Sequence, residues 1–130
     1  MKLLTRTLSA CALAALLSTT FAFALDHGPH MSSGFAGPKA NTGTVSHTYE
    51  NGKSILRVST DFKVPDTPAP TCRIVDSKGT IYTLDAFKIK GGEKRQVNVP
   101  GFVHDIAKVQ VYCAWAELLL GEANFASAVK

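Results

Sequence analysis

The sequence has little charge and no long hydrophobic run. Charged residues make up 18% of the 130 residues, and hydrophobic residues make up 45%. A chain with this much apolar material builds a packed core, which excludes intrinsic disorder, and its length suits about one domain. The longest apolar stretch, at residues 8–17, is too short to span a bilayer, because a spanning helix needs roughly 18 or more apolar residues.

The sequence also lacks the short motifs that mark common enzymes. It contains no G-x-S-x-G, no H-E-x-x-H and no glycine-rich phosphate loop, and no close pair of carboxylates falls on one expected face. Hydrolase and kinase chemistry therefore has no support, and whether the protein is an enzyme stays open. A nucleophile pair of Cys113 with His104 rests on composition alone.

Residues 1–24 have the layout of a secretory signal. Lys2 and Arg6 precede the apolar stretch, polar residues follow it, and Ala22-Phe23-Ala24 fits an A-x-A cleavage site. We expect a signal peptide over 1–24 that is cleaved after Ala24. The mature protein is then periplasmic or secreted and keeps no transmembrane segment.

Cleavage removes two basic residues, so 12 lysines and arginines face 10 acidic residues and the net charge falls to +2. The one group of basic residues consists of Lys88, Lys90, Lys94 and Arg95. Proteins that bind nucleic acids concentrate more basic side chains on one face. We therefore expect no nucleic acid partner.

The mature chain divides into an extended N-terminal segment at 25–42, rich in glycine and proline, and a folded domain at 43–130. In the domain, short runs of alternating apolar and polar residues are separated by turn signals, among which Asn51-Gly52 favours a hairpin. No run keeps the helical period over a full helix length. About seven to eight short strands predict an all-β fold, a single antiparallel β-sandwich.

Finer expectations follow from the same patterns. The strands should lie near residues 45–49, 55–62, 71–76, 80–84, 87–89, 97–99, 108–114 and 118–125. A second hairpin should turn at residues 77–79, and Ile106 and Ala107 should close a short helical turn. Phe35 should anchor the extended segment on the domain, and His47 and His104 should lie at the surface or rim.

Two cysteines remain once Cys11 leaves with the signal. Strand alternation places both Cys72 and Cys113 on inward faces. In an oxidising compartment a bridge between them is the expected arrangement, with Cα atoms about 5–6 Å apart and a contribution to stability of roughly 4 kcal/mol. Two alternatives stay open: one cysteine is a redox-active thiol or a ligand for a cofactor iron, or both are inert buried thiols.

The expected mature N-terminus offers a second candidate site. It reads Leu25-Asp26-His27, and its α-amine, two amides and third-position imidazole form the square-planar nitrogen set that suits Cu(II) or Ni(II). His30 and the neighbouring Met31 add nitrogen and sulfur donors nearby. The alternative is a solvated, flexible tail.

The order of motifs in the domain carries a resemblance. Gly43-Thr44-Val45 and the Asn-Gly hairpin lead to a proline-containing loop. The second half contains the stretches LDAFKIKGG at 84–92, QVNVP at 96–100, VQVYC at 109–113 and LGEA at 120–123. Over approximately residues 34–126 this order resembles the electron-transfer DM-thirteen domain family.

The resemblance implies a β-sandwich domain of exported or cell-surface proteins with a redox role. Cys113 matches the family cysteine that is proposed to act as a thiol or as a ligand for a group such as haem, and Pro100 matches a family proline. The chain departs from the pattern with Tyr112, where tryptophan is usual, and with Cys72 as an available partner for Cys113.

Two functions stay open at this point. The first, implied by the resemblance, is an exported redox or electron-transfer accessory domain that uses Cys113, alone or with Cys72, and meets a periplasmic or membrane redox protein. The second is a non-catalytic, disulfide-stapled binding module, with or without a metal on its tail. Haem and copper are the cofactors that these readings allow.

Overall fold

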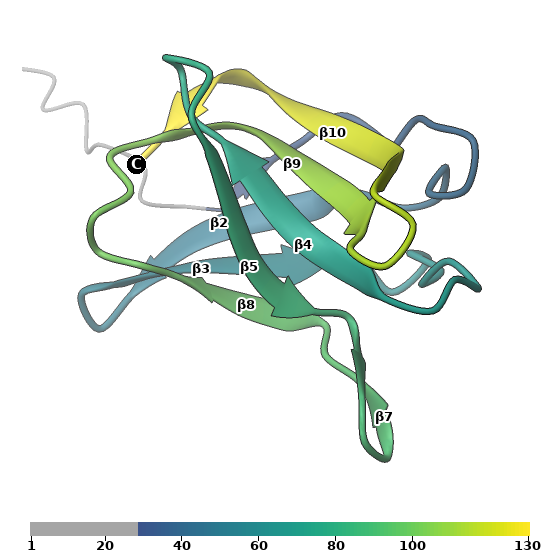
Figure 1. The fold of residues 1–130 in the computed structure, drawn as a ribbon. Coiled ribbons are helices and arrows are strands. Elements are labelled where there is room, and N and C mark those ends of the chain that lie inside the picture. The colour runs from purple at the N-terminus through teal and green to yellow at the C-terminus, as the bar shows by residue number, and fades with distance from the viewer. Residues whose placement is uncertain (1–28) are drawn as a thin grey trace, which may run out of the picture.

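The computed structural model describes residues 29–130, which form an all-β domain of two four-stranded antiparallel sheets and one two-stranded ribbon. Figure 1 shows β2, β3 and β8 in one layer and β4, β5, β9 and β10 in the other. The predicted antiparallel β-sandwich is confirmed. The predicted signal at 1–24 and the tail residues Leu25, Asp26 and His27 lie outside the described residues.

One sheet has the strand order β1-β2-β3-β8. Its strands are His30–Met31, Val45–Glu50, Lys53–Val58 and Gln96–Val99. Asn51 and Gly52 join β2 to β3 with φ values of 50° and 75°. Two consecutive positive φ values are those of a type I′ turn, so the predicted Asn-Gly hairpin is confirmed.

The other sheet has the order β10-β9-β4-β5. Its strands are Leu118–Val129, Ile106–Cys113, Pro70–Val75 and Ile81–Ala86. The predicted turn between β4 and β5 is confirmed: Gly79 has a φ of 86°, and Asp76 Oδ1 accepts hydrogen bonds from the N–H groups of Lys78 and Thr80 at 2.9 and 2.8 Å. A short ribbon of β6 (Lys88–Ile89) and β7 (Gly92–Glu93) projects from the sandwich (Figure 1).

The predicted helical turn at Ile106 and Ala107 is wrong, because β9 already begins at Ile106. Ile106 pairs with Val129 of β10, and only 1% of Ile106 is exposed. Burial of a β-branched side chain between the sheets, together with backbone pairing to a distant strand, favours strand over helix here. Within residues 29–130 no helix is long and apolar enough to span a bilayer.

The core lies between the two sheets and extends into the N-terminal segment. Phe35, Phe62 and Phe87 form a series of buried rings, with centroid distances of 5.0 Å and 5.4 Å. The prediction that Phe35 anchors the segment is confirmed. The aliphatic part of the core comes from both sheets and includes Val45, Leu56, Val97, Ile74, Val109 and Val111.

Residues 36–40 of the same segment pack along β10. The Ala36 and Glu122 backbones exchange two hydrogen bonds of 2.9 Å, and the Ala40 N–H donates to the Leu120 carbonyl at 2.9 Å. Gly37 and Gly121 permit this approach, since a Cβ on either one would overlap backbone atoms of the facing segment. The segment is thereby held along the first half of β10, at the edge of that sheet.

Candidate functional site

The two cysteines lie on neighbouring strands of one sheet, Cys72 on β4 and Cys113 on β9. Both are buried, with exposed fractions of 2% and 1%. Each belongs to the row of inward side chains on its strand, together with Ile74 and Val111 respectively. The inward orientation is as the alternation predicts.

The predicted bridge between them is not formed, and both thiols are free. The register places Cys72 opposite Val111, and Cys113 opposite Pro70. The cysteines are therefore diagonal neighbours, which stand about 7–8 Å apart, whereas bridged cysteines have Cα atoms within roughly 6.8 Å. The prediction was wrong because alternation gives the face of a strand but not its register.

The surroundings of Cys72 hold its thiol in the neutral form. Burial in the core raises the pKa of Cys72 to about 12, and the negative charge of Asp85 acts in the same direction. A thiol must ionise to act as a nucleophile or a metal ligand. Cys72 is therefore a packing residue.

Cys113 has the opposite environment. The pKa of its thiol is lowered, chiefly because the Ala116 N–H donates to Sγ at 3.5 Å, and backbone groups of Ala69 and Trp115 act in the same sense. Burial opposes this effect without cancelling it. Backbone N–H groups aimed at a sulfur stabilise the thiolate, so Cys113 is the cysteine with nucleophilic character.

An apolar cavity of about 260 Å³ opens beside Cys113. Its walls come from residues 36–40, the loop before β4 and the turn between β9 and β10. They include Pro38, Lys39, Thr67, Pro68, Trp115 and Leu118. Trp115 is 77% exposed and Leu118 is 60% exposed, so the rim is an uncovered apolar surface.

The cavity does not fit haem. Its cysteine sulfur and apolar walls suit a haem iron chemically, but its volume lies below the range of roughly 300–1,000 Å³ that holds drug-sized ligands. Copper would find Cys113 as its one soft donor there, because no histidine or methionine lines the cavity. Across residues 29–130 no three His, Cys, Asp or Glu side chains gather as a metal site. The cavity suits a small apolar group or one side chain.

The structure describes three of the four histidines, and His47 overturns a prediction. It is 1% exposed, not at the surface or rim, because it shares the inward face of β2 with Val45. Its Nε2 lies 2.6 Å from Ser54 Oγ, while Nδ1 is buried without a partner. Burial and the nearby His30 lower the pKa of His47, so its imidazole is neutral.

The other two histidines are exposed. His30, a predicted metal residue, pairs with His47 across β1 and β2, with ring centroids 5.9 Å apart. His104 lies on the connection before β9, at the rim as predicted. The copper set at Leu25, Asp26 and His27 lies outside residues 29–130 and stays a prediction.

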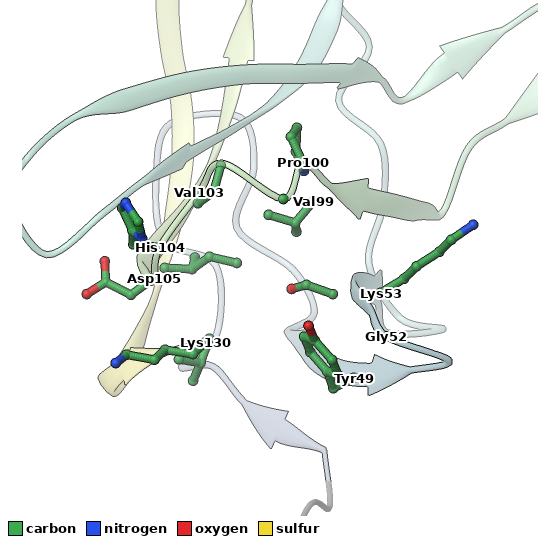
Figure 2. A pocket seen from close by; sticks show the side chains of 13 residues that line it. Tyr49, Gly52, Lys53, Val99, Pro100, Val103, His104, Asp105 and Lys130 are labelled. Carbon is green, nitrogen blue, oxygen red and sulfur yellow. The ribbon is translucent and has the colours of Figure 1, made fainter.

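A second cavity, of about 330 Å³, lies at the end of the sandwich where β2 and β3 turn (Figure 2). Its lining comes from residues 49–54, 99–106 and 129–130. Figure 2 shows the Tyr49 hydroxyl pointing into the cavity and His104 with Asp105 on the opposite side. No sequence signal marks this cavity, because the three segments meet only through packing of the two sheets.

Comparisons with known proteins found no matching family model, no similar curated protein and no similar solved structure. The resemblance to the electron-transfer DM-thirteen domain therefore stays a prediction that rests on the order of motifs over approximately residues 34–126.

Proposed function

We propose that this protein is an exported redox accessory domain whose working group is the Cys113 thiol. One observation carries the proposal: a thiol of lowered pKa lies on an apolar cavity, while the second cysteine is held neutral in the core. The resemblance to an electron-transfer domain and the predicted signal peptide support the same reading. Redox chemistry that needs both cysteines has no support from the register.

The reaction that suits this site is thiol–disulfide exchange. The Cys113 thiolate attacks one sulfur of a partner's disulfide, the partner's S–S bond breaks, and a new S–S bond joins Cys113 to the attacked sulfur. The other partner sulfur leaves as a thiolate and takes a proton from water. The partner disulfide is the oxidant, and the product is a mixed disulfide.

Cys72 does not resolve that mixed disulfide. Its pKa of about 12 leaves almost no thiolate, and it lies diagonally across the strand pair from Cys113. The adduct therefore persists until a thiol of the partner or of another protein attacks it. An accessory domain that passes a disulfide from one protein to another behaves in this way, whereas a dithiol enzyme resolves its own mixed disulfide.

Access to Cys113 runs through the cavity that it lines, and because the cysteine is only 1% exposed, side chains of the turn at residues 114–117 must move while the Ala116 N–H stays on the sulfur. All four residues of this turn are exposed. Two hydrogen bonds hold the turn beside the sulfur: Ala114 N–H to the Ala69 carbonyl at 3.0 Å, and Ala116 N–H to Cys113 Sγ. Short exposed segments with few buried contacts open at low cost in free energy.

The partner that fits is an exported or membrane redox protein with an apolar side chain beside its disulfide. That side chain would enter the cavity, while the exposed Trp115, Leu118 and Leu119 supply the surrounding contact. Exposed apolar patches of this kind mark interaction sites. The cavity volume of about 260 Å³ suits one side chain.

The proposal is tested with 4,4′-dithiodipyridine, a small apolar disulfide whose leaving group is coloured. The native protein should release one equivalent, the Cys72→Ala variant should release one, and the Cys113→Ala variant none. Alanine at either position keeps the side chain apolar, and near-UV circular dichroism checks that both variants fold. Release of two equivalents by the native protein, or of one by Cys113→Ala, would overturn the proposal.

A second candidate function is a non-catalytic binding module. The cavity at the end of the sandwich favours it, because hydroxyl, basic and apolar groups meet there on a scaffold of strands. The disulfide staple of the sequence-based alternative does not belong to this candidate, since both thiols are free.

A further inference from the structure

Ser54 presents a hydrogen-bond donor to the cavity of Figure 2. His47 Nε2 and Ser54 Oγ are 2.6 Å apart, and His47 Nδ1 is buried without a partner. A buried N–H group without an acceptor is rarer than a buried nitrogen lone pair without a donor. We therefore assign the imidazole proton to Nε2 and leave the lone pair on Nδ1. His47 then donates to Ser54, and the Ser54 O–H is left to donate elsewhere. Ser54 lines the cavity, and the described residues offer its hydroxyl no acceptor.

Tyr49 adds a second donor on the same wall. It stands directly opposite Ser54 in the β2–β3 pair, and its hydroxyl points into the cavity in Figure 2. Among residues 29–130 this hydroxyl has no hydrogen-bond partner. Two neighbouring hydroxyl donors without acceptors favour a ligand that has two acceptor oxygens at one end, because each oxygen can accept from one hydroxyl.

The charged groups around the cavity favour a negative ligand. Lys53 and Lys130 both line it. These two ammonium groups face one carboxylate side chain in the lining, that of Asp105, which accepts hydrogen bonds from the Ser77 N–H and hydroxyl at 2.9 and 2.5 Å and keeps its negative charge. Lys53 extends outward in Figure 2, and its flexible stem allows the ammonium to swing over a bound anion.

Apart from His104, the rest of the lining is apolar or glycine. Val99, Val103, Ile106 and Val129 contribute hydrocarbon surface, and the volume of about 330 Å³ lies at the small end of the range for ligand sites. We propose that this cavity binds a small organic monocarboxylate. The carboxylate accepts hydrogen bonds from Ser54 and Tyr49 near the lysines, and the hydrocarbon part packs against the valines and Ile106. This inference does not depend on Cys113 and stands or falls separately from the redox proposal.

The test is an NMR titration of the ¹⁵N-labelled protein with three probes of equal length: sodium hexanoate, hexan-1-ol and hexylammonium chloride. Hexanoate should shift the amide signals of Ser54, His104 and Ile106 and saturate. Hexanol should bind more weakly, and hexylammonium should leave these signals in place. Absence of cavity shifts with hexanoate, or equal binding of the ammonium probe, would overturn the proposal.

Variants locate the contact. Tyr49→Phe removes one donor from a residue that is 59% exposed, and so it keeps the fold. It should weaken hexanoate binding about tenfold, the size expected for a hydrogen bond to a charged group. Tyr112→Phe removes a phenol outside the cavity and is the matched control. Lys53→Gln should also weaken binding, with Lys90→Gln as its control. Equal affinities for Tyr49→Phe and Tyr112→Phe would contradict the assigned contact.

Discussion

Alkylation of the native protein should modify its two cysteines at rates that differ by a large factor. The pKa of Cys72 is raised from 9.0 to about 12, whereas that of Cys113 is lowered from 9.0. Each pKa unit is tenfold in thiolate at a pH below both values, so Cys72 holds at least about 1,000-fold less thiolate than Cys113. With iodoacetamide near neutral pH, Cys113 should be modified first and Cys72 should stay unmodified over the same period.

The assay follows intact mass over time and maps the modified peptide. The rate of Cys113 modification should rise with pH and reach a plateau, and the midpoint of this rise should lie below pH 9.0. In denaturant, both cysteines should react at similar rates, which controls for intrinsic reactivity. Modification of native Cys72 at a rate comparable to that of Cys113, or a Cys113 midpoint above 9.0, would refute the assignment of Cys113 as the ionisable thiol.

Three further predictions concern stability and metal binding. Because the pKa of His47 in the folded protein lies below 6.5, the unfolded chain binds a proton at this imidazole first as the pH falls. The free energy of unfolding should therefore be greatest above about pH 6.5 and decline below it, and urea midpoints should show a smaller decline for His47→Gln. Gly121→Ala should cost about 1–3 kcal/mol in denaturant unfolding, because its Cβ would overlap the Ala40 backbone, whereas Gly101→Ala, which meets open space, should cost little. If cleavage follows Ala24, the mature protein should bind one Cu(II) in a visible absorbance titration, and equal uptake by His27→Ala would place the metal elsewhere.

Local signals in the sequence were sufficient for most strands and for the two predicted hairpins, but not for β1 or for the first residues of β9. Asn51-Gly52 predicted its turn because both residues adopt positive φ, and alternation predicted the inward faces of Cys72 and Cys113. These are short-range consequences of backbone sterics and of side-chain period. The fold class follows from them because apolar faces at strand spacing pack as two sheets.

Features that depend on contacts between distant segments were not predictable in the same way. The diagonal offset of the cysteines depends on how β4 and β9 align, and no residue near either cysteine reports that register. The burial of His47 depends on the second sheet covering its face. Both cavities are lined by residues far apart in the chain, so their chemistry emerged only with the packing.

The fate of a mixed disulfide at Cys113 distinguishes a site with one working thiol from a dithiol pair. The reduced protein is first converted to the adduct of Cys113 with glutathione and freed of small thiols, and its intact mass is then followed over time. We predict that the adduct is lost slowly and at the same rate in the native protein and in Cys72→Ala, because the Cys72 thiol is neutral and lies diagonally across the strand pair. If the native protein alone lost glutathione and became two hydrogen atoms lighter than the reduced protein, a Cys72–Cys113 bridge would have formed. That result would contradict the assignment of Cys113 as a thiol that works without Cys72.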